Sequence, residues 1–93
     1  MPEFEHESVK RLFQAMLTLE NTEECARFFE DLCTVKEIRD LAQRLDVAIS
    51  LRGGKNYQEI SAQTGASTAT ISRVNKCLLY GKGGYAGVIE KLN

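Results

Sequence analysis

Residues 57–76 read YQEISAQTGASTATISRVNK and have the spacing of a helix-turn-helix. Asn56 can cap the first helix, and Glu59, three residues later, completes a capping box. Gly65 ends this helix after about two turns, because glycine enters the left-handed conformation of a tight turn at little cost. We therefore predict a helix-turn-helix over about residues 57–80.

The second helix of this pair separates its apolar from its polar side chains. At about 100° per residue, Ile71, Val74 and Leu78 lie on one side. Ile71 and Val74, together with Ile60 of the first helix, would lock the two helices to each other and to the core. The opposite side is small, hydroxylated and basic, and no Asp or Glu occurs between Glu59 and Glu90. Such a face can enter the major groove of double-stranded DNA without a steric or charge conflict. The residues that we expect to contact DNA are Gln58, Ser67, Thr68, Ala69, Ser72, Arg73 and Lys76.

A second interpretation of the same segment is a helical hairpin that only packs. Glycine between two helices is common, and a polar helix face is usually just solvated. Thr64 and Ala66 flank the turn, where more apolar residues are usual. The small side chain of Ser61, in contrast, lets the two helices approach closely.

The rest of the chain also has the pattern of helices, and its one proline is at position 2. Apolar residues recur every three or four positions over residues 9–17, as in an amphipathic helix. A second helix is expected over about residues 23–32, with Phe28, Phe29 and Leu32 on its buried side.

The longest expected helix follows Thr34, which opens a capping box with Glu37. Gly53 and Gly54 stop this helix. A last short helix is expected over residues 85–92. The stripe of the longest helix that we expect to form the spine of the core consists of Ile38, Leu41, Ala42, Leu45, Ala48 and Ile49.

The charge is unevenly distributed along the chain. Residues 1–50 contain 6 Lys and Arg and 11 Asp and Glu, a net charge of −5, whereas residues 51–93 contain 6 and 2, a net charge of +4. This division favours an anionic partner for the second half, although a small chain can also vary this much by chance.

Other classes of function find little support in the sequence. The three cysteines form no Cys-x-x-Cys pair, and the one histidine is His6, so we expect no metal site. No set of nucleophile, base and orienting residue is present, so we expect no catalytic residues and no enzyme. No apolar run approaches the roughly 20 residues of a membrane span, and the acidic start lacks the order of a signal peptide. We therefore expect a cytoplasmic protein that does not contact a membrane.

Residues 34–80 resemble the core of the Trp repressor superfamily, in particular its subgroup of short Trp-repressor-like proteins of the YerC/YecD type. The resemblance rests on TVKE at 34–37, QRL at 43–45, the Gly53-Gly54 stop and TGASTATISR at 64–73. It implies an all-α, intertwined homodimer of six-helix chains whose helix-turn-helices bind operator DNA.

The resemblance also implies an effector pocket. In the tryptophan-binding members, two arginines clamp the co-repressor, and they match Arg44 and Arg73 here. Two threonines of the same pocket match Thr34 and Thr70. A glycine that leaves room for the indole is replaced by Val74, so we do not expect L-tryptophan as the effector, and no other cofactor is implied. Two alternatives remain for the arginines. A smaller anion can bind between Arg44 and Arg73, or Arg44 can form an ion pair with an acid of a neighbouring helix.

We therefore predict one all-α domain over residues 1–93, with about six helices, that forms a homodimer. A single small chain has few ways to bury Phe28 and Phe29 together with Val9, Phe13 and Leu17, and a second copy supplies the missing core. The predicted function is that of a sequence-specific DNA-binding regulator of transcription, expected to act as a repressor. The alternative is a protein-interaction module whose acidic first half binds a partner and whose helix-turn-helix serves only packing.

Overall fold

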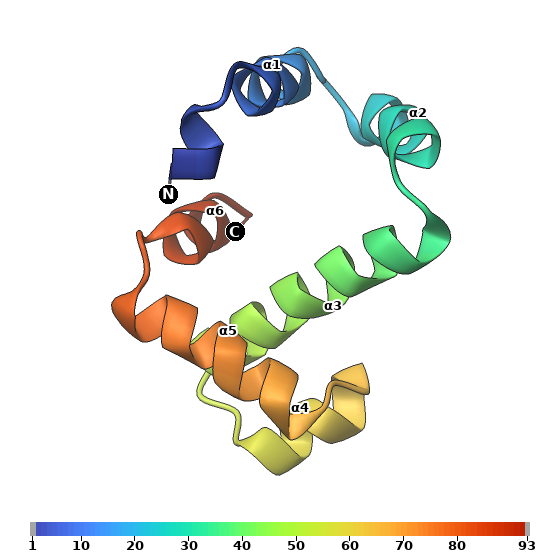
Figure 1. Cartoon of the computed structure of the whole chain (residues 1–93). Coiled ribbons are helices and arrows are strands. Elements are labelled where there is room, and N and C mark those ends of the chain that lie inside the picture. The colour runs from blue at the N-terminus through green and yellow to red at the C-terminus, as the bar shows by residue number, and fades with distance from the viewer. Residues whose placement is uncertain (1, 93) are drawn as a thin grey trace. The chain divides into compact units, whose positions relative to one another are not determined.

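The computed structural model of the chain describes residues 2–92, which contain helices and the loops between them but no strand. The fold class is all-α, as the sequence predicts. No helix in this range is long and apolar enough to cross a lipid bilayer. The six α-helices are α1 (Glu7–Met16), α2 (Thr22–Leu32), α3 (Val35–Arg52), α4 (Tyr57–Thr64), α5 (Thr68–Tyr80) and α6 (Gly84–Leu92) (Figure 1).

The chain divides into two compact units between Lys36 and Glu37, just after the start of α3. We call them the N-terminal unit and the C-terminal unit, and each has its own packing. The single domain over residues 1–93 stays a prediction.

The N-terminal unit consists of α1, α2 and a short 3-10 helix, Pro2–Glu5, which the sequence pattern did not predict. The ring of Phe4 meets that of Phe13 edge-on, with 6.1 Å between the centroids. The expected inward residues of α2 are only partly covered, since Phe28 and Phe29 are half-buried and Leu32 is exposed. None of the described residues of this unit is buried.

The helix ends follow the capping residues of the sequence closely. The capping box of α4 is present: Asn56 Oδ1 accepts a hydrogen bond from Glu59 N (2.9 Å), and Glu59 Oε1 accepts one from Asn56 N (3.2 Å). The start of α2 lies one residue earlier than predicted, because Asn21 Oδ1 caps Glu24 N at 2.8 Å. The start of α6 likewise lies one residue earlier, at Gly84.

The long helix α3 has the predicted ends but a different buried side. Its buried residues are Val47 and Ala48, and Leu45 is half-buried. At about 100° per residue, Val47 lies on the opposite side of the helix from Ile38. The core therefore contacts α3 along a strip that only partly coincides with its apolar stripe. The members of the expected stripe that stay exposed in the single chain are Ile38 (37%), Leu41 (45%), Ala42 and Ile49 (39%).

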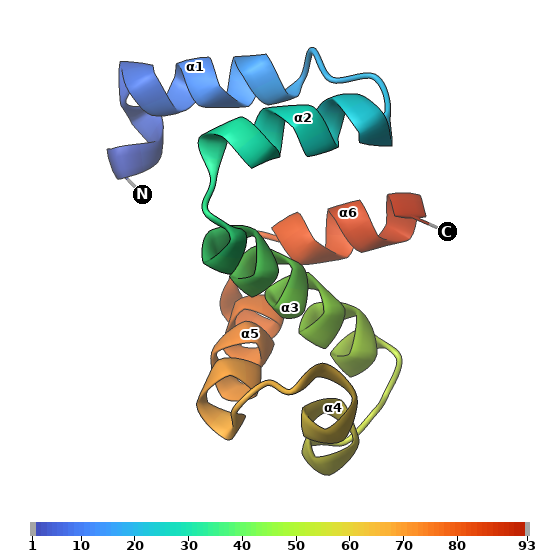
Figure 2. The ribbon, with the colours of Figure 1, turned by 90° about the vertical axis from the view of Figure 1, so that its right-hand side faces the viewer.

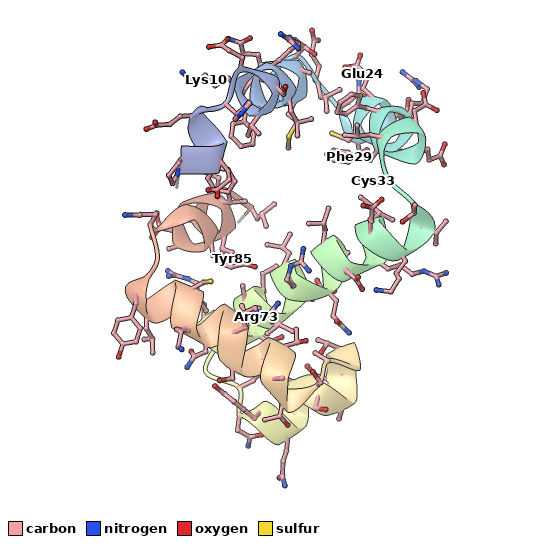
Figure 3. The ribbon with its side chains drawn as sticks, in the orientation of Figure 1. Lys10, Glu24, Phe29, Cys33, Arg73 and Tyr85 are labelled. Atoms are coloured by element: carbon pink, nitrogen blue, oxygen red, sulfur yellow. The ribbon has the colours of Figure 1, made fainter. Side chains whose placement is uncertain are left out.

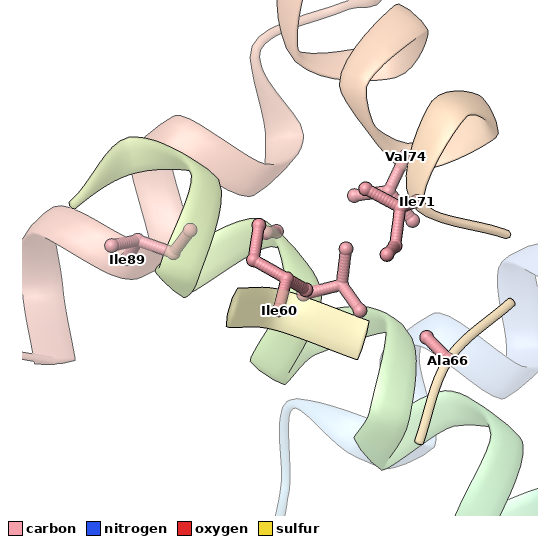
Figure 4. Close-up of a cluster of buried hydrophobic side chains, with 7 residues drawn as sticks. Ile60, Ala66, Ile71, Val74 and Ile89 are labelled. Atoms are coloured by element: carbon pink, nitrogen blue, oxygen red, sulfur yellow. The ribbon is translucent and has the colours of Figure 1, made fainter. Parts of the chain in front are cut away.

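The core of the molecule lies in the C-terminal unit, where α3, α4, α5 and α6 meet (Figure 4). Leu45, Leu51, Leu78 and Tyr85 pack against it as half-buried neighbours. Because α4 and α5 both contribute to this core, apolar packing joins the helix-turn-helix to α3. The buried residues are Val47, Ala48, Ile60, Ala66, Ile71, Val74 and Ile89.

Candidate nucleic-acid interface

The predicted helix-turn-helix is formed by α4, α5 and the short turn between them, which Figure 2 shows. Gly65 ends α4 with φ 74° and ψ 5°, in the left-handed region, as the sequence predicts. Ile60, Ile71 and Val74, the expected locking residues, are all buried. The spacing of the motif thus translates into two helices packed against each other and on the core.

Two hydroxyl side chains stabilise the turn. Thr64 Oγ1 donates to Ile60 O (2.7 Å) and accepts from Ala66 N (3.2 Å). Ser61 Oγ donates to Ala66 O at 3.0 Å. Thr64 and Ala66, which looked too polar and too small for this position, therefore serve the turn by hydrogen bonding and by the burial of Ala66. Ser61, for which the sequence predicts only a small side chain between the two helices, contributes this hydrogen bond in addition.

The start of α5 is capped by Ser67, one of the residues expected to contact DNA. Ser67 Oγ accepts from Thr70 N at 3.2 Å and donates to Thr70 Oγ1 at the same distance. A cap of this kind satisfies one of the free N–H groups of the first turn. Thr70, a predicted effector residue, is half-buried and has its hydroxyl engaged in this cap.

All seven residues that we expect to contact DNA are exposed to solvent. On α5, the side opposite the buried Ile71 and Val74 contains Ala69, Ser72, Arg73 and Lys76, of which Figure 3 labels Arg73. The exposed side combines two cations with small and hydroxylated side chains, and α5 contains no acid. Their contacts with DNA stay predictions. The seven residues are Gln58, Ser67, Thr68, Ala69, Ser72, Arg73 and Lys76.

A hollow of about 410 Å³ lies between the starts of α4 and α5. Its lining joins Gln58 and Thr68, two predicted contact residues, to three residues that the sequence pattern did not assign to the interface. The three additional lining residues are Tyr57, Ser61 and Ala62.

The four predicted effector residues are not brought together within one unit. Thr34 belongs to the N-terminal unit, whereas the other three belong to the C-terminal unit. Arg44 is half-buried on α3, and Arg73 is exposed on α5. Val74 is 1% exposed and lies in the core, not at an open cavity. Among residues 2–92, no three His, Cys, Asp or Glu side chains are placed to hold a metal ion together.

Sequence reasoning missed the polar contact that joins α3 to the turn. Gln43 Nε2 donates to the carbonyl oxygen of Thr64 at 3.0 Å. The two residues are 21 positions apart, so no periodicity or capping pattern connects them. Only the packing of α4 on α3 brings them into contact.

Comparison with known proteins places this fold in a family. The family model described as Trp repressor protein matches residues 7–93. The uncharacterized protein YerC of Bacillus subtilis (strain 168) is 54% identical over 82 residues, which are 88% of this chain and 79% of that protein. A TrpR-like protein from Eubacterium eligens has a solved structure with a TM-score of 0.95 and 49% identity, covering 99% of this chain and 95% of the other. A second solved structure, from Staphylococcus aureus, has a TM-score of 0.91 and 49% identity, covering 95% and 88%.

Proposed function

Since the chain belongs to the Trp repressor protein family, we propose that it is a regulator of transcription that binds specific double-stranded DNA through α4 and α5. The proposal takes the exposed side of α5 as the surface that enters the major groove. It takes the homodimer as the binding species and repression as the expected outcome of binding.

The observation that carries this proposal is the exposed, acid-free side of α5. Arg73 and Lys76 are exposed and can neutralise phosphates or pair with guanine, and Thr68 and Ser72 can bond to bases or phosphates. Ile71 and Val74 hold the opposite side of the helix in the core. A helix anchored in this way presents a fixed set of side chains to a groove.

The test is a titration of labelled genomic DNA fragments with the purified protein at several salt concentrations. A dimer that neutralises several phosphates loses affinity steeply with salt, with log K falling by about 0.9 per phosphate against log salt. We expect a small set of fragments to be retained at a salt concentration that releases the rest. No binding to any duplex at low salt would favour the protein-interaction module instead.

Two kinds of variant separate affinity from sequence preference. Lys76→Ala is expected to weaken binding to all sequences and to reduce the salt slope by about 1 for each phosphate that is no longer neutralised. Thr68→Ala or Ser72→Ala is expected to change which sequence is preferred. Lys91→Ala on α6 removes the same charge outside the proposed surface and serves as the matched control.

The homodimer is supported by apolar surface that one chain leaves exposed. The stripe of Ile38, Leu41 and Ile49 on α3 is uncovered, and the N-terminal unit contains no buried residue among those described. A second copy of the chain would bury both. Two helix-turn-helices related by a twofold axis would then recognise near-palindromic sites, with half-sites about one helical turn of DNA apart.

The effector part of the proposal is negative: L-tryptophan is not the co-repressor. Val74 fills a core position where the tryptophan-binding relatives that the sequence resembles have glycine, and its branched side chain is stiff. Forcing an indole ring against it would cost about 1–3 kcal/mol, as in overpacked cores. Isothermal titration of the unmodified protein with L-tryptophan is expected to show no binding at micromolar concentration. Saturable binding in that range would contradict this part.

A further inference from the structure

We propose that Gln43 is a positioning residue for DNA binding, which fixes the turn of the helix-turn-helix to α3 through its side-chain amide. Its effect on DNA affinity rests on the function proposed above. Its effect on the geometry of the turn does not depend on that function and can be measured without DNA.

The hydrogen bond from Gln43 is short and supplies a donor to a carbonyl group at the C-terminal end of α4. Gln43 is half-buried on α3, and its Nε2 lies 3.0 Å from the carbonyl oxygen of Thr64, the last residue of α4. The last four carbonyl groups of a helix have no partner within the helix. A Cβ added at Gly65 would lie 3.9 Å from the same nitrogen, so the amide sits directly beside the left-handed residue of the turn.

Thr64 is the residue through which this contact can act on α5. Its hydroxyl already joins Ile60 O to Ala66 N, and Ala66 is followed by Ser67, the cap of α5. The amide of Gln43 therefore holds one of the two residues of α4 whose side chains connect this helix to Ala66, at the entry of α5. A shift of Thr64 relative to α3 would move the start of α5.

The apolar contacts in the same region do not define this position by themselves. Val47 on α3 and Ile60 on α4 share the core, but apolar burial is non-directional and tolerates small displacements. A hydrogen bond weakens steeply when its distance or angle departs from the optimum. The contact from Gln43 thus supplies a directional restraint between α3 and the turn.

The residue type follows from the chemistry of the contact. The carbonyl of Thr64 is an acceptor and needs a donor, which a glutamine amide supplies. Methionine has a similar length but no donor. Glutamate has the same shape but, when ionised, only acceptors, and its carboxyl regains a donor on protonation. Gln43→Met therefore removes the hydrogen bond without a change of charge, and Gln43→Glu removes it with an added negative charge.

The first experiment measures the turn by NMR in the protein without DNA. In Gln43→Met, the carbonyl carbon of Thr64 is expected to move upfield and the amide signals of Gly65 and Ala66 to shift. In Gln43→Glu, the same signals are expected to return toward those of the unmodified protein as the new carboxyl group is protonated. Gln63→Glu is the matched control, because it adds the same charge while its Oε1 can still accept from Lys55 Nζ.

The second experiment measures DNA affinity of the same variants. Gln43→Met is expected to lose about two- to tenfold in affinity for a specific site, the range for one hydrogen bond. Its salt slope is expected to stay unchanged, because no phosphate contact is removed. Binding to non-specific DNA should change less than binding to the specific site.

The outcomes separate this proposal from the proposed function. Unshifted Thr64, Gly65 and Ala66 signals in Gln43→Met, or a pH response of these signals in Gln63→Glu equal to that in Gln43→Glu, would overturn it. If the unmodified protein binds no duplex, the function fails, and the NMR titration still decides the role of Gln43. If Gln43→Met does not fold, the pH-dependent return of the turn signals in Gln43→Glu supports the proposal and its absence overturns it.

Discussion

The two units of the molecule form helices equally well but differ in what those helices bury. The N-terminal unit has α1 and α2 of 10 and 11 residues, and none of its described residues is buried in the single chain. The C-terminal unit contains every buried residue among those described. Isolated helices shorter than about 12–15 residues are marginal in water, so α1 and α2 need cover from elsewhere. The difference indicates that one unit carries its own core and that the other does not, which is where the proposed homodimer would supply the missing cover.

The largest expected effect comes from removing an aromatic ring in the N-terminal unit. Phe29→Ala is expected to weaken the proposed homodimer by about 3–5 kcal/mol, as for phenylalanine in a core, because we expect a second chain to bury this half-buried ring. Light scattering at micromolar concentration should show the mass of two chains for the unmodified protein and of one chain for the variant. Glu30→Ala, the exposed neighbour, should keep the mass of two chains. If the unmodified protein has the mass of one chain, a second chain does not cover the N-terminal unit, and the proposed difference between the two units is wrong.

A core residue of the C-terminal unit should behave differently. Ile71→Ala is expected to lower the free energy of unfolding by about 2–5 kcal/mol, because Ile71 is completely buried within its own chain. The folded variant should nevertheless keep the mass of two chains. Denaturant unfolding at fixed protein concentration measures the loss, with the exposed Ser72→Ala expected within about 0.5 kcal/mol of the unmodified protein. If the folded Ile71→Ala variant has the mass of one chain, the core of the C-terminal unit also controls the dimer, and the proposed difference between the two units is wrong.

A substitution in the turn between α4 and α5 is expected to have a smaller effect on the free energy of unfolding, and its cause is purely conformational. Gly65→Ala is expected to cost about 1–2 kcal/mol, because residue 65 has φ 74° and a Cβ is unfavourable there. Space is not the cause, since the nearest atom to an added Cβ is 3.9 Å away. Gly53→Ala, with no positive φ and ordinary contacts at 3.5 Å, is the control and should change little. Equal unfolding energies for the two variants would refute the argument.

The smallest effect concerns α6. Gly87 lies inside this helix, and an added Cβ would meet nothing within 4 Å. Gly87→Ala is therefore expected to stabilise the protein by about 0.5–1 kcal/mol, the difference between the two residues in a helix. Thermal or denaturant unfolding measures the sign. Destabilisation would mean that a second chain packs closely on this part of α6. The contact between the two chains would then include the C-terminal unit as well.

The sequence predicted the features that depend on residues close together in the chain. The capping box at Asn56 and Glu59 and the left-handed Gly65 set helix ends within one turn, so they can be read from local spacing. Burial on α3 could be predicted in this way only in part: Ala48 lies in the predicted stripe, but apolar residues occur around much of the helix and packing also selects Val47. The bond from Gln43 to Thr64 likewise exists only once α4 lies on α3. The predicted interface residues are exposed as expected, and their roles await the DNA measurements.

The composition of the exposed side of α5 also determines how this surface responds to pH. Residues 60–89 contain no Asp, Glu or His, the side chains whose ordinary pKa values lie between about 3.5 and 7. Helix α5 therefore contains no side chain of the kinds that gain a proton on mild acidification. A surface of this composition responds to ionic strength and is insensitive to a moderate fall in pH.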